Sequence, residues 1–211
     1  MSDTLSTIST LIIEGKFADM IAKTNAALEE GLSADKILND GLMPGMDHVG
    51  AEFKVGNLFV PDVLYSAKAM QAAMTIIRPL LAETGVETAG KLVLGTVKGD
   101  LHDIGKNLVG MMCEGAGFEV IDLGNDVDPE VFVEAVKEHK PTILGMSALL
   151  TTTLGAMERT IKILEGAGLR DKVKIMIGGA PVNQDFADQI TADGYASNAA
   201  TASELAKELS K

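Results

Sequence analysis

The sequence predicts an α/β protein in two parts, a four-helix bundle over residues 1–86 and a doubly wound parallel sheet of five strands over residues 91–211. Two patterns predict this division. In the first part apolar residues recur every three or four positions, as in amphipathic helices. In the second part short runs rich in Val, Ile and Leu alternate with helix-like stretches, which indicates parallel strands joined by crossover helices. The polar stretch 84–90 has neither period and is the expected linker.

Four helices are expected in the first part, the shortest over Thr4–Ile13. The second helix ends at Gly31 and should bury one face made of Phe17, Met20, Ile21, Thr24 and Leu28. Ser33 is expected to cap the third helix, which turns Ile37, Leu38 and Leu42 inward. Pro61 opens the fourth helix, whose apolar stripe is Val63, Ala67, Met70, Met74, Ile77 and Leu81.

In the second part, the expected strands are 91–97, 118–124, 142–149, 174–180 and 194–197. The expected helices are 103–116, 129–139, 154–167, 183–190 and 202–209. Because crossovers between parallel strands are right-handed, this order limits the topology to a doubly wound sheet.

Composition excludes several classes of function. The formal net charge is −12 and the isoelectric point is near 4.6, which argues against nucleic acid and anionic membrane surfaces as partners. The single cysteine, Cys113, cannot form an internal disulfide or a two-cysteine metal site. The N-terminus has no signal-peptide pattern, and no run of about 18 apolar residues could span a bilayer. A cytoplasmic protein is expected.

In doubly wound sheets, ligands bind outside the carboxyl ends of the strands. Three loops at that edge carry unusual residues: Asp100–Gly105, Ser147–Thr153 and Gly178–Val182. All three could face one ligand. In the loop after the second strand, Asn125 and Asp128 are instead expected to supply turn and N-cap chemistry.

His102 is one of only three histidines and lies two residues after Asp100. A carboxylate behind an imidazole fixes its tautomer, which is the usual support of a metal-ligating histidine. One histidine is too few for zinc, which takes three or four ligands, but it suffices as the axial ligand of a metal held by a macrocycle. Gly105 would allow a bulky group to approach. A hydrogen-bonded loop imidazole with no ligand is the alternative.

The other two loops also have two interpretations. Gly178-Gly179 could form a tight turn or could leave room for part of a ligand. The hydroxyls of Ser147, Thr151 and Thr153 could line the same site or could cap the helix that follows.

Taken together, these stretches resemble a known family. "GDLHDIGKNLV" is similar to the cobalamin-binding DxHxxG motif, "SALL" to its partner SxL, and "GGAPV" to its paired GG, in the right order. "GNLFVPDVLYSAKAM" resembles the helical cap that precedes this domain in methionine synthase and in corrinoid proteins of methyltransferases. The resemblance covers nearly the whole chain and is nearest to the small corrinoid proteins of multi-component methyltransferases in methanogens and acetogens.

The resemblance implies a role for each motif residue. His102 should replace the benzimidazole of cobalamin as the lower cobalt ligand, Asp100 should hydrogen-bond its other nitrogen, and Thr153 should extend this chain where methionine synthase has serine. Further cofactor contacts are implied for the loop residues Leu101, Asp103, Ile104 and Gly105, and for the slot of the nucleotide tail, Ser147, Leu149, Thr151, Gly178 and Gly179. Asp103 is also a candidate cap of the next helix. Phe59 and Met70 are the expected upper-face contacts, Phe59 foremost; such methionines could equally be bundle core.

The resemblance further implies a methyl carrier with cobalamin as its cofactor. A substrate:corrinoid methyltransferase would place a methyl group on Co(I), and a second methyltransferase would pass it from methyl-Co(III) to tetrahydrofolate or coenzyme M. A reductive activase is the third expected partner. Because no substrate pocket is evident, a carrier subunit is expected more than a free-standing enzyme, and the sequence does not identify the methyl donor. The alternatives are the cobalamin subunit of an adenosylcobalamin-dependent mutase and a corrinoid-sensing regulator, although no basic recognition helix is present.

Overall fold

The computed structural model describes residues 3–84 and 89–211, so 85–88 of the predicted linker lie outside the described residues. The chain divides into two compact units. One is formed by the N-terminal helices together with the short segment Glu114–Gly117, and the other by the rest of the chain from Ala89 onward.

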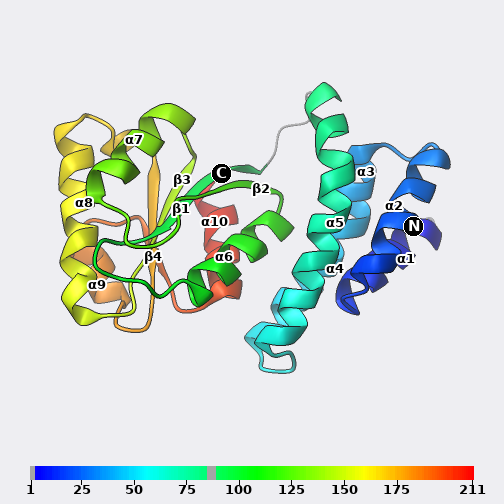
Figure 1. The fold of residues 1–211 in the computed structure, drawn as a ribbon, viewed down its shortest axis with the longest axis horizontal. Coiled ribbons are helices and arrows are strands. Elements are labelled where there is room, and N and C mark those ends of the chain that lie inside the picture. The colour runs from blue at the N-terminus through cyan, green and yellow to red at the C-terminus, as the bar shows by residue number, and fades with distance from the viewer. Residues whose placement is uncertain (1–2, 85–88) are drawn as a thin grey trace. The chain divides into compact units, whose positions relative to one another are not determined.

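The N-terminal unit consists of α1 (Asp3–Ile13), α2 (Phe17–Glu29), α3 (Ala34–Ile37), α4 (Met43–Lys54) and α5 (Val60–Thr84) (Figure 1). A π turn, Leu38–Leu42, joins α3 and α4 into one continuous helix, so the described part of this unit has the four helices predicted. Pro44 has no amide hydrogen for the usual helical bond, and the wide turn occurs directly before it.

Most of the predicted core of this unit is buried. Ser33 caps α3 by accepting a hydrogen bond from the amide of Lys36 at 3.2 Å. The inward residues are confirmed for the third helix (Ile37, Leu38, Leu42) and for α5 (Val63, Ala67, Met70, Met74, Ile77, Leu81). The prediction for α2 is partly wrong, because Phe17 and Ile21 are about half exposed. The buried stripe of α2 is narrower and comprises Met20, Thr24 and Ala27, spaced as one helical face that packs chiefly on α5.

The second unit contains the predicted doubly wound sheet. Its strands are β1 (Gly90–Thr96), β2 (Phe118–Asp122), β3 (Ile143–Ser147), β4 (Lys174–Gly178) and β5 (Gly194–Ala196). They are all parallel, in the order β2-β1-β3-β4-β5. The strand order therefore reverses at β1, which has β2 on one side and β3 on the other. In such sheets the ligand crevice opens at this switch point, between the loops that follow β1 and β3.

Five helices of this unit cover the two faces of the sheet. Figure 1 shows α7 (Pro129–His139), α8 (Leu154–Gly166) and α9 (Gln184–Gln189) on one face, and α6 (Ile104–Gly115) and α10 (Ala199–Leu209) on the other. The core under α7 and α8 is almost entirely aliphatic around the ring of Phe132. α10 begins three residues earlier than predicted, because Asn198 and Thr201 form a reciprocal capping box. Among the described helices, none is both long and apolar enough to cross a bilayer.

Candidate functional site

The carboxylate of Asp100 joins the loops that follow β1 and β3. It lies just beyond β1 and is fully buried. Its Oδ1 accepts a hydrogen bond from the backbone N–H of His102 at 3.1 Å and lies 2.7 Å from Nδ1 of the His102 imidazole. Its Oδ2 accepts from the backbone N–H groups of Leu149 at 2.6 Å and Leu150 at 3.1 Å. One carboxylate thus fixes the histidine and the SxL loop together at the switch point of the sheet.

These hydrogen bonds decide the protonation state of the site. Burial alone would raise the pKa of Asp100, but donors from Leu149, His102 and Leu150 outweigh it and hold the pKa well below its usual value. An ionised carboxylate can only accept, so Nδ1 of His102 must carry the hydrogen between them. In the neutral ring, Nε2 then keeps its lone pair. Because half of the His102 side chain is exposed, a ligand can reach it.

Thr153, predicted to extend this chain, lies beside the same carboxylate. Its hydroxyl oxygen is 3.1 Å from Oδ2 of Asp100 and 2.8 Å from the carbonyl oxygen of Leu150. A hydroxyl has one hydrogen and can serve only one of these acceptors at a time. Since two backbone amides already hold Oδ2, Thr153 is one of several donors to the carboxylate and not its sole support.

Two features of the His102 loop, Asp100–Gly105, were not predicted. The buried Thr96 on β1 donates its hydroxyl hydrogen to the carbonyl of His102 at 3.0 Å. Lys106, also buried, places its ammonium 2.6 Å from both carboxylate oxygens of Asp122 at the end of β2. Thr96 is a polar residue inside an otherwise apolar strand, and this was the available sequence signal for it, whereas Lys106 is followed by the polar Asn107 and had no such signal. A lysine is rarely buried unless it is paired, so this ion pair anchors the first turn of α6.

The loop after β2, residues 123–128, plays a larger part than predicted. Asp128 does occupy the N-cap position of α7, but its side chain caps nothing there and lies 3.2 Å from the ammonium of Lys98. Asn125 reaches across to the His102 loop, where its side-chain amide donates to the carbonyl of Leu101 at 3.3 Å. Turn and cap chemistry alone is therefore a wrong description of this loop.

Exposed apolar side chains lie on the two loops that Asp100 joins. Leu101, Ile104, Leu149 and Leu150 are between 41% and 79% exposed. Large aliphatic side chains left in water on two joined loops are typical of a binding surface. A broad, mainly apolar ring with an axial coordination position fits this donor set. Asp103 directly precedes α6, and its backbone carbonyl accepts a hydrogen bond from the backbone N–H of Asn107 at 2.7 Å.

The glycines of the motifs have different physical reasons. A Cβ on Gly179 would lie 1.8 Å from the carbonyl oxygen of Ala148, and its φ of +127° suits only glycine, so packing between the β3 and β4 loops requires it. On Gly178 a Cβ would lie 3.1 Å from the carbonyl oxygen of Ala196. On Gly105 a Cβ would meet nothing within 4 Å. No described protein atom explains Gly105, whereas a ligand lying over it would. Nearby, Ser147 is half-buried and Thr151 is exposed.

The two predicted cap residues differ in exposure. Phe59, which directly precedes α5, is 69% exposed, and its backbone N–H donates to Asp62 at 2.8 Å. Met70 is 1% exposed and belongs to the core residues of the chain. In this structure Met70 presents no surface to a ligand, because the helix face on which it lies is the buried stripe of α5.

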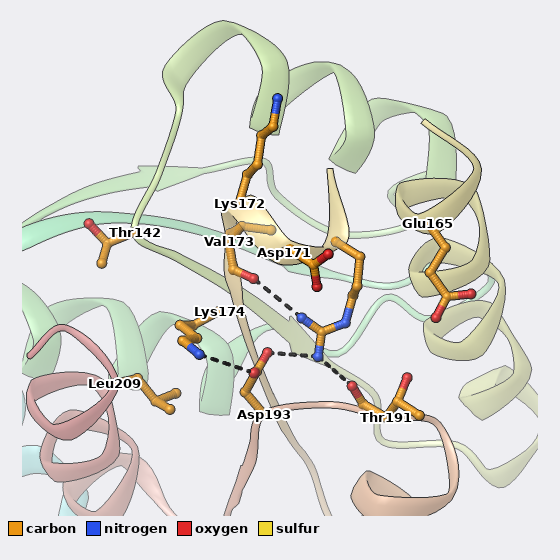
Figure 2. Close-up of a pocket in the computed structure, with 10 residues that line it drawn as sticks. Thr142, Glu165, Asp171, Lys172, Val173, Lys174, Thr191, Asp193 and Leu209 are labelled. Carbon is orange, nitrogen blue, oxygen red and sulfur yellow. Dashed lines mark hydrogen bonds and ion pairs between the residues drawn. The ribbon is translucent and has the colours of Figure 1, made fainter. Parts of the chain in front are cut away.

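A hollow of about 560 Å³ lies at the opposite edge of the sheet, where the strands begin (Figure 2). Three of its charged side chains, Arg170, Lys174 and Asp193, are joined in one network. The guanidinium of Arg170 donates to the carbonyl of Thr191 at 2.5 Å and lies 2.9 Å from Asp193, to which Lys174 also approaches at 3.6 Å. This network ties the starts of β4 and β5 together. None of the predicted site residues lines it.

Among the described residues, no cluster of three or more His, Cys, Asp or Glu side chains could hold a metal ion. A doubly wound sheet with one carboxylate-supported imidazole and an apolar rim at its switch point is instead the arrangement of a cobalamin-binding protein. Two family models, each described as a B12 binding domain, match residues 90–204 and 5–78. The chain belongs to the family of corrinoid proteins with a B12-binding domain.

Its relatives have matching lengths. The chain is 43% identical over 209 residues to a corrinoid protein of Desulfitobacterium hafniense, covering 97% of this chain and 96% of the relative. It is 44% identical over 206 residues to the dimethylamine corrinoid protein of Methanosarcina barkeri, with the same coverage. These matches confirm the family, the fold class and the corrinoid cofactor expected from the sequence.

Two solved structures are similar over nearly the whole chain. One is a cobalamin-binding protein of Desulfitobacterium hafniense DCB-2, with a TM-score of 0.81, 34% identity, and coverage of 97% of this chain and 98% of that chain. The other is the methanol:cobalamin methyltransferase complex MtaBC of Methanosarcina barkeri, with a TM-score of 0.87, 34% identity, and coverage of 99% of this chain and 80% of that chain.

Proposed function

We propose that the chain is the corrinoid methyl carrier of a multi-component methyltransferase system. The observation that carries the proposal is the ring of His102, whose Nδ1 is held by a buried carboxylate while its other edge is open. A bound corrinoid supplies a cobalt centre that is nucleophilic toward methyl groups when reduced and that gives the methyl group up to an acceptor. The protein binds, orients and shields that centre, and the difficult chemistry belongs to the cofactor.

In this proposal Nε2 of His102 would bind the cobalt of the corrinoid. Five hydrogen-bonding contacts keep the Asp100 carboxylate ionised, so its oxygens can only accept hydrogen bonds. Asp100 therefore keeps the ring in the tautomer with the hydrogen on Nδ1. Thr153 contributes one of those contacts.

The loop surface would hold the rest of the cofactor. Leu101, Ile104 and Leu149 offer exposed aliphatic surface to the lower face of the ring, and Leu150 adds to it. Gly105 would allow close approach, since no atom of the described residues lies within 4 Å of where its Cβ would be, apart from its own helix backbone. Ser147, Thr151, Gly178 and Gly179, together with Asp103 at the start of α6, are the proposed contacts to the nucleotide tail and the ring edge.

We propose Phe59 as the upper-face contact, because its ring is exposed at the start of α5. Met70 was expected there too, but its burial assigns it to the core in this arrangement. The helical unit and the α/β unit are proposed as separate domains, with the boundary in the stretch 84–90.

The partners follow from the chemistry of a carrier. One methyltransferase must deliver the methyl group; the MtaBC complex pairs a corrinoid subunit with such an enzyme in Methanosarcina barkeri. A second methyltransferase must transfer the methyl group to tetrahydrofolate or coenzyme M. A reductive activase must restore Co(I) after adventitious oxidation. The relatives that are named for dimethylamine and trimethylamine make methylamines the first donors to test.

The test uses the chain loaded with hydroxocobalamin and reduced under anaerobic conditions. It is incubated with radiolabelled dimethylamine, trimethylamine or methanol and with the methyltransferases that co-purify with the chain from its native cells. Label should appear on the protein-bound corrinoid for one donor, and light, which cleaves carbon–cobalt bonds, should release it. A sample without the methyltransferases is the control. Corrinoid isolated only in the adenosyl form, with no label from any donor, would contradict the proposal in favour of a mutase subunit.

A further inference from the structure

The loop after β2, residues 123–128, contacts the backbone that leads into His102. The carboxylate of Asp126 accepts the backbone N–H of Gly99 at 2.8 Å. In return, the backbone N–H of Asp126 donates to the carbonyl of Asp100 at 2.9 Å. Asp126 thus holds the two-residue segment Gly99-Asp100 at both ends, through the N–H of Gly99 and the carbonyl of Asp100, and Asp100 is the residue that orients the imidazole.

The backbone of Asp126 is strained at this point. Its φ of +53° lies in the left-handed region, which residues other than glycine adopt rarely. Asparagine and aspartate tolerate the conformation best, and glycine adopts it without strain. Glycine at position 126 would have less backbone strain than aspartate, so the carboxylate is expected to make a contact that offsets this strain. Strained residues cluster at functional sites. The amide of Gly99, which itself has a φ of +86°, provides that contact.

Charge pairing is the smaller contribution here. The ammonium of Lys98 lies 3.5 Å from Asp126 and 3.2 Å from Asp128, but all three side chains are about half exposed. Water and salt screen such pairs strongly. The Gly99 amide, ahead of Lys98, is also the main cause that lowers the pKa of Asp126 below its usual value. The hydrogen bond to the Gly99 amide is therefore the contact on which the positioning argument rests.

We propose that Asp126 is a positioning residue for the lower cobalt ligand. By holding residues 99–100 at both ends, it sets where the Asp100 carboxylate lies and hence how the His102 ring is presented. The inference rests on the proposed function and deepens it, because it adds a residue from the loop after β2 to a site built from the loops after β1 and β3. No direct contact between Asp126 and the cofactor is required.

The test compares Asp126→Gly with Asp126→Asn. The glycine variant removes the carboxylate acceptor but also relieves the backbone strain, so it should not destabilise the fold through the backbone. A change in histidine ligation can then be assigned to the lost hydrogen bond. The asparagine variant keeps an oxygen acceptor for the Gly99 amide. Each protein is loaded with hydroxocobalamin and reduced to Co(II), and the ratio of histidine-ligated to unligated cobalt is measured by electron paramagnetic resonance. Amide hydrogen exchange at Gly99 is measured in the unloaded proteins.

Asp126→Gly should lower that ratio by roughly 2- to 10-fold, the effect of losing one net hydrogen bond, and should speed exchange at Gly99. Asp126→Asn should stay close to the wild type. Lys140→Gly is the matched control, because Lys140 has a φ of +46° at the end of α7 and lies outside the site. It should relieve strain without changing the ratio.

The outcomes separate this inference from the proposed function. An Asp126→Gly protein with the wild-type ratio and wild-type Gly99 exchange would overturn the positioning role alone. A wild-type protein whose cobalt has no histidine ligand would overturn the proposed ligand, and the inference with it. A ratio that falls equally in the asparagine and glycine variants would also contradict the inference, since it would assign the effect to the charge.

Discussion

Replacing Asp100 by asparagine is expected to lower the ratio of histidine-ligated to unligated cobalt by about 10- to 100-fold, as loss of the group that orients a ligating histidine commonly does. Both oxygens of the Asp100 carboxylate act as acceptors. Oδ1 accepts from His102, and Oδ2 accepts from the backbone N–H groups of Leu149 and Leu150. An amide has one acceptor and one NH₂ group, so it must oppose one set of donors. If the NH₂ faces the ring, Nδ1 becomes the acceptor and the ring hydrogen moves to Nε2, which can then no longer bind cobalt.

The same substitution should lower the free energy of unfolding of the unloaded protein by about 1–3 kcal/mol, the usual result of leaving a buried donor without an acceptor. It should also change the acid sensitivity. Because folding lowers the pKa of Asp100, its stabilising contribution is full above the usual value of 3.8 and is lost as the pH falls below it. Chemical denaturation between neutral and acid pH should show this loss in the wild type, and a smaller loss in Asp100→Asn.

Thr153→Val is the matched control for this prediction. It removes the hydroxyl but leaves the amides of Leu149 and Leu150 on the carboxylate, so the ligation ratio should change several-fold less than in Asp100→Asn. Equal effects of the two substitutions would contradict the conclusion that the backbone amides are the main support of Asp100. They would favour the hydroxyl as an essential part of the chain.

Replacing Gly179 by alanine should have the largest effect on stability. The new Cβ would lie 1.8 Å from the carbonyl oxygen of Ala148, and the φ of +127° is not available to alanine without strain. Because the obstacle is backbone, the β3 and β4 loops must separate, which would break the 3.2 Å bond from the Ala148 amide to Gly178. We expect a loss of about 3 kcal/mol or more, measured by denaturant unfolding without cofactor.

Gly105→Ala is the control that separates packing from ligand access. Its Cβ would meet no described atom within 4 Å, and its backbone is helical, so the unloaded protein should unfold like the wild type. Corrinoid binding should weaken if the ring lies over this position. A stable Gly179→Ala protein would contradict the packing argument, whereas unchanged corrinoid affinity in Gly105→Ala would contradict the proposed position of the ring.

Elements with strong periodic patterns were predictable. The stripe of α5 and the α7 boundaries follow directly from the sequence, because burial on one helix face and a proline at the start are local signals. Phe17 and Ile21 were misassigned because a helix of mixed pattern does not reveal how wide a face its neighbours cover. The early start of α10 depends on the cap that Asn198 and Thr201 form with each other. The pattern of apolar residues around this cap is weaker and did not indicate the start.

The site was predictable where a motif placed residues close together in sequence. Asp100 and His102 are two positions apart, and their contact follows from that spacing. Thr96, Lys106 and Asp126 could not be assigned, because their partners depend on strand order and on backbone conformation. The backbone amides of Leu149 and Leu150 leave almost no trace in residue types, since any residue except proline would supply them.

The measurement that most directly tests the central claim is the nitrogen hyperfine splitting of Co(II) in the loaded protein. The chain is produced with ¹⁵N-histidine and loaded with unlabelled cobalamin, so the nuclear spin distinguishes an imidazole of the protein from the benzimidazole of the cofactor. If His102 is the lower ligand, the triplets seen with unlabelled protein become doublets, and His102→Ala abolishes the doublets. Triplets that persist in the labelled protein would show that the benzimidazole remains bound, which would contradict the account.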